Sequence, residues 1–409
     1  MGQPVQETLP EIFGISRSNP QPTHNGTNSA NSTTSATRPS VLDKFNGEFS
    51  GHGFNTIFRP HSLNPNTPTK FHINPFSNKR NNPDNVLQLN LTHETQNFSK
   101  MRESVANRGF NKQADIFLDG WTYTQSVEDV TTPGEKPTSI HFETGFWLSI
   151  PESNKPALVV SLARMASIPH GTTINAQCFQ PPVTTKGAPD IAKSPFDITP
   201  FITGSNPEEK VPPFTSQKAT NNDTFRIPQD LTQFIKANTL TQEMIDNPNV
   251  VLVNANKGKE IIDNTVFTIS TTPTASNEGG GTSNIGFLVG DDSPSKRGNG
   301  DGNANAAKVT ATYWVSTVNA NIDLKPFKPT EAQPSRTFSP APLRPNEVVP
   351  VFSVKFEIPS AKTVKVQYTQ IQYSQNVFLD FGGLSWPHAS VATLIPTDPQ
   401  ELHPSILRQ

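Results

Sequence analysis

The stretch FNGEFSGHGFNTIFRP, residues 45–60, sets the expectation for the fold. Its phenylalanines suit a strand, yet glycines occupy positions 47, 51 and 53. A glycine inside a strand marks a sharp bend or the close approach of another backbone. Strands that bend in this way fit a closed barrel better than the flatter sheets of a sandwich, so we expect residues 45–60 to open a β-barrel.

Other segments of the chain alternate between apolar and polar residues with the period of two that strands require. Two of them, 113–130 and 138–151, are separated by Thr-Pro-Gly-Glu-Lys-Pro, which predicts a hairpin. The others with this pattern are residues 84–98, 306–324 and 361–381. Residues 157–179 indicate a nearly continuous apolar strand, a Pro-His-Gly corner and a further strand, and residues 388–396 indicate a buried strand. Together they predict an all-β fold, a single closed antiparallel barrel of about ten strands that is large enough to hold one small ligand.

The alternation stops between two blocks, 45–178 and 307–396. We therefore expect one barrel domain over residues 41–396, interrupted by a loop-rich insertion at about 179–306 that carries one or two short helices. Residues 1–40 are rich in Asn, Ser, Thr and Pro and are expected to form a disordered tail. Residues 397–409 are expected to form a C-terminal tail.

The composition of the chain argues against several classes of protein. The 409 residues carry a formal net charge of −2 without a basic block, which argues against binding to nucleic acid or an anionic membrane. No apolar run is long enough to predict a transmembrane segment. The single cysteine, Cys178, rules out an intrachain disulfide framework. With no signal peptide apparent, we expect an intracellular, cytoplasmic protein.

Short motifs resemble known barrel families. GEFSGHGF, residues 47–54, resembles the Gly-x-Trp-x-Gly-x-Gly first strand of nitrobindin-like proteins, with Phe49 in the Trp position, and the Gly-x-Trp start of lipocalins. HFETGFWL, residues 141–148, resembles the His-x-Glu-x-Gly-aromatic strand of nitrobindins. SIPHGTTINAQ and LSWPHASVATL look like segments of proteins that are named haem-binding or peroxidase-like. The resemblance implies a calycin-type barrel with haem as its cofactor.

His388 is the candidate metal ligand. The resemblance implies that a histidine on the closing strand binds the haem iron, with Asp380 available to orient it. The residues themselves add that His388 shares a strand face with Ser390 and Ala392, whose small side chains leave room beside an imidazole. The alternative is an ordinary buried histidine that holds the strand through hydrogen bonds.

Three further residues are candidate contacts to the cofactor: His170, His52 and Arg164. His170 lies in a Pro-His-Gly corner, which indicates a turn with a positive φ at Gly171 or a group at the barrel mouth. His52 is flanked by glycines that also suit a barrel bend. Arg164 interrupts an apolar strand and needs a partner, either Glu143 or Asp115 or an acidic group of the ligand.

Three functions remain open. The first is haem binding, with peroxidase-like activity or scavenging of reactive species. The second is a carrier or a metal-free cyclase-type pocket for an apolar small molecule such as a lipid or terpenoid. The third is a structural or interaction protein with a solid barrel. In the second case the pocket is expected to be aromatic, lined by Phe142, Phe146, Trp121, Trp147 and Trp314. No enzyme motif decides whether the protein is an enzyme.

Overall fold

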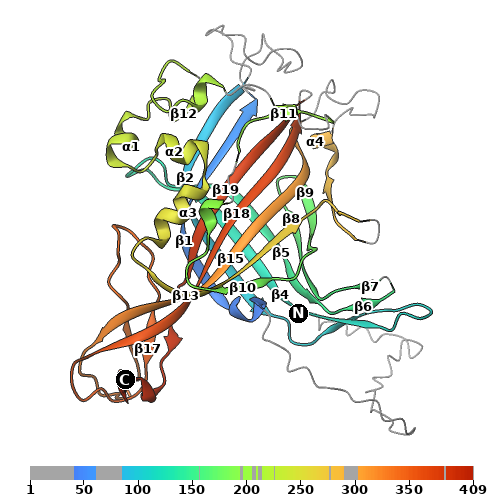
Figure 1. Cartoon of the computed structure of the whole chain (residues 1–409). Helices are drawn as coiled ribbons and strands as arrows, with labels where there is room; N and C mark the ends of the chain where they lie inside the picture. The colour runs from blue at the N-terminus through green and yellow to red at the C-terminus, as the bar shows by residue number, and fades with distance from the viewer. Residues whose placement is uncertain are drawn as a thin grey trace, which may run out of the picture. The chain divides into compact units, whose positions relative to one another are not determined.

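Ten antiparallel strands close into a barrel, as the sequence predicts (Figure 1). The order around the wall is β13-β15-β18-β19-β1-β2-β4-β5-β8-β9, and β9 returns to β13 through the pair Gln177 and Ser270. The strands are β1 (Gly47–Pro60), β2 (Asn85–Lys100), β4 (Ile116–Asp129), β5 (Thr138–Ile150), β8 (Ser161–Ile168), β9 (Thr172–Cys178), β13 (Glu260–Ser270), β15 (Asn305–Leu324), β18 (Lys362–Phe381) and β19 (Leu384–Pro396).

The computed structural model describes residues 41–60, 85–155, 157–193, 197–204, 209–210, 214–224, 226–275, 278–289, 303–381 and 384–408. The expected disordered tail, residues 1–40, lies outside these ranges. The expected hairpin is confirmed, because β4 and β5 pair antiparallel from Asp129 and Thr138 onward.

The glycines of β1 let neighbouring backbone come close. A Cβ atom at Gly51 would lie 1.8 Å from the carbonyl oxygen of Thr393, and one at Gly53 would lie 2.1 Å from that of Val391. Both carbonyls belong to β19, with which β1 pairs. No other residue type fits at these two positions, because any side chain would collide with the next strand of the wall.

Each barrel strand has an inner and an outer face. On β5, Glu143 and Trp147 are buried inside the barrel, whereas Phe142 and Phe146 are about half exposed on its outer wall. On β2 the outward face is the leucine face, because Leu87 packs in the apolar cluster outside the barrel. The polar face of β2 therefore lines the interior.

A helical segment covers the outer wall over β1, β2 and β19. It contains α1 (Thr232–Ala237), α2 (Gln242–Asp246) and α3 (Asn249–Asn256), which confirms the two short helices expected and adds a third. Asn238 ends α1 in the left-handed conformation, and the Thr241 side chain caps α2 by accepting a hydrogen bond from the Met244 amide. Leucine and phenylalanine side chains of these helices pack against the wall.

The expected insertion, 179–306, contains a strand of the barrel itself. β13 pairs with β15 along most of its length, so the expectation that this interval lies wholly outside the barrel is corrected. The sequence marks only its second half, within VFTISTTP (residues 266–273), as a possible strand, and the pairing with β15 extends it to 11 residues. The smaller elements of the interval are η3 (Ile191–Lys193), η4 (Thr215–Gln217), β10 (Val183–Lys186), β11 (Phe201–Ile202), β12 (Arg226–Ile227), β14 (Gly281–Asn284) and α4 (Gly286–Val289).

β15 and β18 extend past the barrel and carry a second, smaller sheet (Figure 1). This sheet consists of β16 (Arg336–Phe338), β17 (Phe352–Val354) and β20 (Gln400–Glu401), followed by η5 (Pro404–Arg408). A separate apolar cluster joins it to the strand extensions. The expectation of a simple tail at 397–409 is thereby corrected, because β20 pairs with β17. The remaining elements are η2 (Val41–Lys44), β3 (Val105–Asn107), β6 (Ser153–Asn154) and β7 (Ala157–Leu158).

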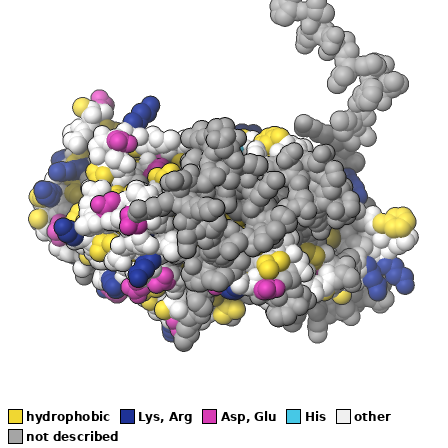
Figure 2. Space-filling model, turned by 90° about the horizontal axis from the view of Figure 1, so that it is seen from above, with side chains coloured by type: hydrophobic (Ala, Val, Ile, Leu, Met, Phe, Trp, Pro, Cys, Tyr) yellow, Lys and Arg dark blue, Asp and Glu magenta, His cyan; other side chains and the backbone are white. Residues whose placement is uncertain are grey.

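The surface carries charges of both signs. Figure 2 shows Lys and Arg interspersed with Asp and Glu over the described part of one face, without a large patch of either sign. Among the described residues, no helix combines the length and the apolar character that crossing a membrane requires.

Candidate functional site

The barrel encloses a cavity of about 410 Å³. One end of the interior is closed by an aromatic plug of Phe45, Phe49, Phe98, Trp121 and Trp147, which belong to one buried cluster. The Phe45 ring contacts Phe98 and Trp147, and Phe49 contacts Phe98. The cavity occupies the other half, where the inward residues are smaller or polar. Its volume lies within the roughly 300–1,000 Å³ of ordinary small-molecule sites.

A buried hydrogen-bond network separates the cavity from the aromatic plug, and Arg164 is its centre. The guanidinium is 2% exposed, lies 2.5 Å from Glu143 Oε1 and donates at 2.8 Å to the hydroxyls of Tyr123 and Tyr313 and to Gln375 Oε1. The guanidinium also lies over the Trp147 ring of the aromatic plug. Every donor direction of the arginine is therefore used within the protein.

The pKa values of two buried glutamates of this network move in opposite directions. Burial alone would raise the pKa of Glu143, but the Arg164 guanidinium and the neighbouring His141 override it and hold that pKa at about 2. Burial raises the pKa of Glu94, and hydrogen bonds from Tyr373 and Gln96 only partly offset it. Glu143 is thus a stable anion, whereas the Glu94 carboxyl is a weaker acid than usual.

Glu94 belongs to the polar floor of the cavity, which we define as Glu94, Gln125, Tyr373 and Gln375. Tyr373 donates to Glu94 Oε2 at 2.6 Å, and Gln125 donates to Oε1 at 3.0 Å. These four side chains come from β2, β4 and β18, which are not consecutive in the chain. The floor offers a bound molecule both donors and acceptors.

Three histidines form part of the cavity wall: His141 on β5, His170 at the corner between β8 and β9, and His388 on β19. His141 lies 3.2 Å from Glu143 Oε2, and its ring meets that of His170 edge-on at 5.0 Å between centroids. His388 Nε2 lies 3.1 Å from Asn55 Oδ1. Because an amide oxygen only accepts, Nε2 of His388 carries the proton and Nδ1 keeps its lone pair.

Two of the histidines are neutral near pH 7. Burial, together with His141 and His170, lowers the pKa of His388 to about 3. Burial and His141 also lower the pKa of His170, although Glu143 partly opposes the effect. A neutral imidazole can accept a proton, accept a hydrogen bond or bind a metal ion.

The rest of the wall is mixed. Aliphatic side chains from four strands and from α4 form an apolar sleeve: Val127, Ile140, Ile168, Val377, Leu379 and Leu288. Polar side chains lie beside them: Asn55, Gln88, Asn90, Thr92, Thr172, Asn284 and Ser390. The site therefore combines apolar surface with polar groups, as ligand pockets commonly do.

The structure brings together two of the four residues expected to contact a cofactor. His388 and His170 both line the cavity, and Gly171 has the positive φ expected of the Pro-His-Gly corner. His52 is corrected: it points outward from β1, where its Nε2 lies 3.1 Å from the Asn346 carbonyl oxygen. Arg164 takes the structural alternative, paired with Glu143 below the cavity floor.

The expected aromatic pocket is also corrected, because none of its five residues lines this cavity. Phe142 and Phe146 lie on the outer wall, since they occupy the opposite strand face from His141 and Glu143. Trp121 and Trp147 fill the aromatic plug, and Trp314 packs outside the barrel under the helices.

Several site residues were missed by sequence reasoning. Asn55, rather than Asp380, makes the hydrogen bond of His388, and it lies on a neighbouring strand that the sequence does not place. Glu94 and Tyr373 could have been found from the polar faces of their strands, but the alternation alone does not say which face points inward. Those polar faces, Asn90-x-Thr92-x-Glu94-x-Gln96 and Tyr373-x-Gln375, were the available signal.

The side chains that could bind a metal ion are considered as groups. Among the described residues, no group of three or more His, Cys, Asp and Glu is arranged to hold a metal ion. Cys178 is buried, and burial raises the pKa of its thiol, which disfavours the reactive thiolate.

The function is inferred from the barrel and its cavity, because the comparisons with known proteins found no match. No family model matches the chain, and neither a curated protein nor a solved structure matches it.

Proposed function

We propose that the barrel binds one small organic molecule, largely apolar with a hydrogen-bonding end, in the histidine-lined cavity. The observation that carries the proposal is the division of the cavity into an apolar sleeve and a polar floor of Glu94, Gln125, Tyr373 and Gln375. A ligand of this kind buries its apolar body against the aliphatic wall and pairs its polar end with the floor. A carrier or a metal-free cyclase-type pocket both fit this chemistry.

The floor supports specificity because its groups are fixed in advance. Gln125 and Tyr373 are held by Glu94, and Gln375 is held by Arg164, so little conformational entropy is lost when a ligand arrives. A ligand with a hydroxyl or carbonyl can add a hydrogen bond to these groups, typically about 0.5–1.5 kcal/mol, and an aliphatic ligand cannot. Purely aliphatic molecules are therefore expected to bind more weakly than their alcohols or ketones.

Haem is the second candidate, and the observation favouring it is that His388 and His170, both neutral imidazoles, share the cavity wall. The fit is partial. Arg164, expected to pair with an acidic group of the haem, is enclosed by Glu143 and two tyrosines, and the protonated nitrogen of His388 is bound to Asn55. His388 would have to bind iron through Nδ1 or exchange its partner.

One experiment separates the two candidates. Native mass spectrometry of the purified full chain identifies any co-purified molecule, and titration with haemin follows the Soret band. We expect an organic ligand of a few hundred daltons and no Soret shift that depends on His388. A Soret shift in the wild type that His388→Ala abolishes would establish haem as the ligand instead.

Ser390→Leu tests the location of the organic ligand. Ser390 lines the cavity beside His388, and a leucine there would reduce the space available. Bound ligand should fall at least tenfold in this variant, whereas His403→Ala, a change at the exposed histidine just before η5, should leave it unchanged. Equal ligand content in the wild type and Ser390→Leu would mean that the cavity is not the binding site.

A further inference from the structure

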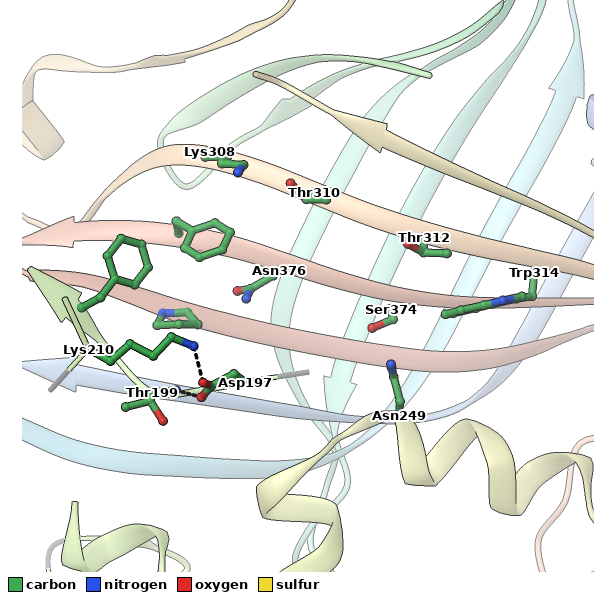
Figure 3. Close-up of a pocket in the computed structure, with 13 residues that line it drawn as sticks. Asp197, Thr199, Lys210, Asn249, Lys308, Thr310, Thr312, Trp314, Ser374 and Asn376 are labelled. Atoms are coloured by element: carbon green, nitrogen blue, oxygen red, sulfur yellow. Dashed lines mark hydrogen bonds and ion pairs between the residues drawn. The ribbon is translucent and has the colours of Figure 1, made fainter. Parts of the chain in front are cut away.

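A second pocket lies on the outside of the barrel, over β15 and β18 (Figure 3). Its volume is about 340 Å³. The base is formed by the outward faces of the two strands, and the sides are formed by Asp197, Lys210 and Asn249 of the segment that covers them. Figure 3 shows Trp314 at one end of the pocket and the Lys210–Asp197 ion pair toward the other.

The base of the pocket is a ladder of polar side chains. In the strand register Thr310 is opposite Asn376, and Thr312 is opposite Ser374. Three buried oxygens of this ladder, Thr310 Oγ1, Ser374 Oγ and Asn376 Oδ1, have no hydrogen-bond partner among the described residues. Ser374 is only 5% exposed. Buried polar groups are almost always paired, so neighbouring oxygens left without a partner indicate a site that water or a ligand completes.

The mouth of the pocket adds positive charge and aromatic surface. Lys308 Nζ lies 5.4 Å from the centre of the Phe378 ring, and no carboxylate of the described chain forms an ion pair with it. Lys210 is already paired with Asp197. Phe201 and Phe378 stand at 61° with 5.7 Å between their centres. One uncompensated cation therefore remains beside an aromatic surface.

We propose that this outer pocket binds a small sugar that carries one acidic group. Neighbouring hydroxyls of a sugar both donate and accept, which is what a ladder of hydroxyl and amide oxygens requires. The C–H face of a sugar ring packs on an aromatic surface, here Phe378 with Phe201. The acidic group pairs with Lys308, and a hydrogen bond to a charged group is about twice as strong as a neutral one.

This proposal is independent of the function of the barrel cavity. The two sites use opposite faces of β18: Tyr373 and Gln375 face the cavity, whereas Ser374 and Asn376 face the outer pocket. A carboxylate and a phosphate would both satisfy Lys308, so the class is an acidic sugar and the test distinguishes the two groups.

The test uses saturation-transfer difference NMR on the full chain with three probes: glucose, glucuronate and glucose 6-phosphate. We expect binding of at least one acidic probe and at least tenfold weaker binding of glucose. Lys308→Met should weaken the acidic probe about tenfold. Ser374→Ala should weaken it severalfold without lowering the melting temperature, because it removes a hydroxyl that has no partner in the free protein.

A matched control is Lys100→Met. Lys100 also lies over an aromatic ring, 5.3 Å from the centre of Trp121, but outside the pocket, so its loss should leave binding unchanged. The proposal fails if none of the three probes binds, which would mean that water alone completes the ladder. It also fails if glucose binds as well as both acids and Lys308→Met has no effect.

Discussion

Single residues show how strongly position inside the barrel controls chemistry. Glu94 and Glu143 are both buried, yet only Glu143 lies against Arg164, and the pKa values of the two carboxyls move in opposite directions. His141 and His388 likewise line one cavity, but His141 contacts an anion and His388 an amide. The protonation state of each group follows from its nearest partner and its distance from water.

His388 gives a pH-dependent prediction. Its pKa in the folded protein, about 3, is below the ordinary 6.5, so below pH 6.5 the unfolded chain takes up a proton that the folded chain does not. Stability due to the neutral imidazole is therefore complete above about pH 6.5 and is lost as the pH falls toward 3. His388→Gln, which keeps an N–H for Asn55, should flatten the fall in stability between pH 6.5 and 4.5.

Urea unfolding at pH 7, 5.5 and 4.5 measures the effect. The wild type should lose up to about 1.4 kcal/mol for each pH unit through this group, and the difference between wild type and His388→Gln isolates it from the other titrating residues. Parallel stability curves for the two proteins would show that His388 does not titrate as its surroundings imply.

At the scale of elements, β1 illustrates how one strand shapes the wall. Gly51 and Gly53 face β19 at positions where the carbonyl oxygens of Thr393 and Val391 occupy the space of a side chain. The strand can therefore lie closer to its neighbour than ordinary side chains allow, and β1 bends with the barrel. The same bend places Asn55 beside His388.

Gly51→Ala should separate β1 from β19. A Cβ atom 1.8 Å from a backbone oxygen cannot be relieved by a rotamer change, so the cost should be about 3 kcal/mol or more. Gly286→Ala in α4 is the control, because its Cβ would meet no atom within 4 Å, and it should change stability by less than about 0.5 kcal/mol. Thermal unfolding of both variants compares them, and equal melting temperatures would contradict the close approach.

For the whole molecule, the strength of strand pairing varies around the barrel. β15 and β18 pair along their full lengths, from Asn305 to Leu324, whereas β9 and β13 meet at the single pair Gln177 and Ser270. The barrel is closed, but this seam has few backbone hydrogen bonds to hold it. Local opening should begin where pairing is sparse.

Hydrogen exchange detected by mass spectrometry tests the seam. Peptides that cover β9 and β14 should exchange earlier than peptides that cover β15 and β18, which serve as the internal reference. A saturating ligand in the cavity should slow exchange at the β8–β9 corner, because His170 lines the site. Equal protection around the whole wall would mean that side-chain packing, rather than backbone pairing, holds the seam.

The sequence by itself determined the barrel and part of its site. Strand patterns covered nine of the ten wall strands and marked part of the tenth, residues 266–273, as a possible strand. The glycines of residues 45–60 indicated a bent wall, and the small residues beside His388 placed it in a cavity. These features are local: the strand period, the room beside the backbone and the side-chain volume are all set by residues that are neighbours in the sequence.

Only the tertiary structure decided which strand faces point inward. The leucines of β2 face outward because the helical segment covers them, so Glu94, on the opposite face of the strand, points into the cavity. β13 joins the wall only through its pairing with β15. The partners of Arg164 come from strands up to 211 residues away, and the outer pocket needs a cover from residues 197–249. Such contacts depend on chain topology, and a strand pattern is equally consistent with either face being buried.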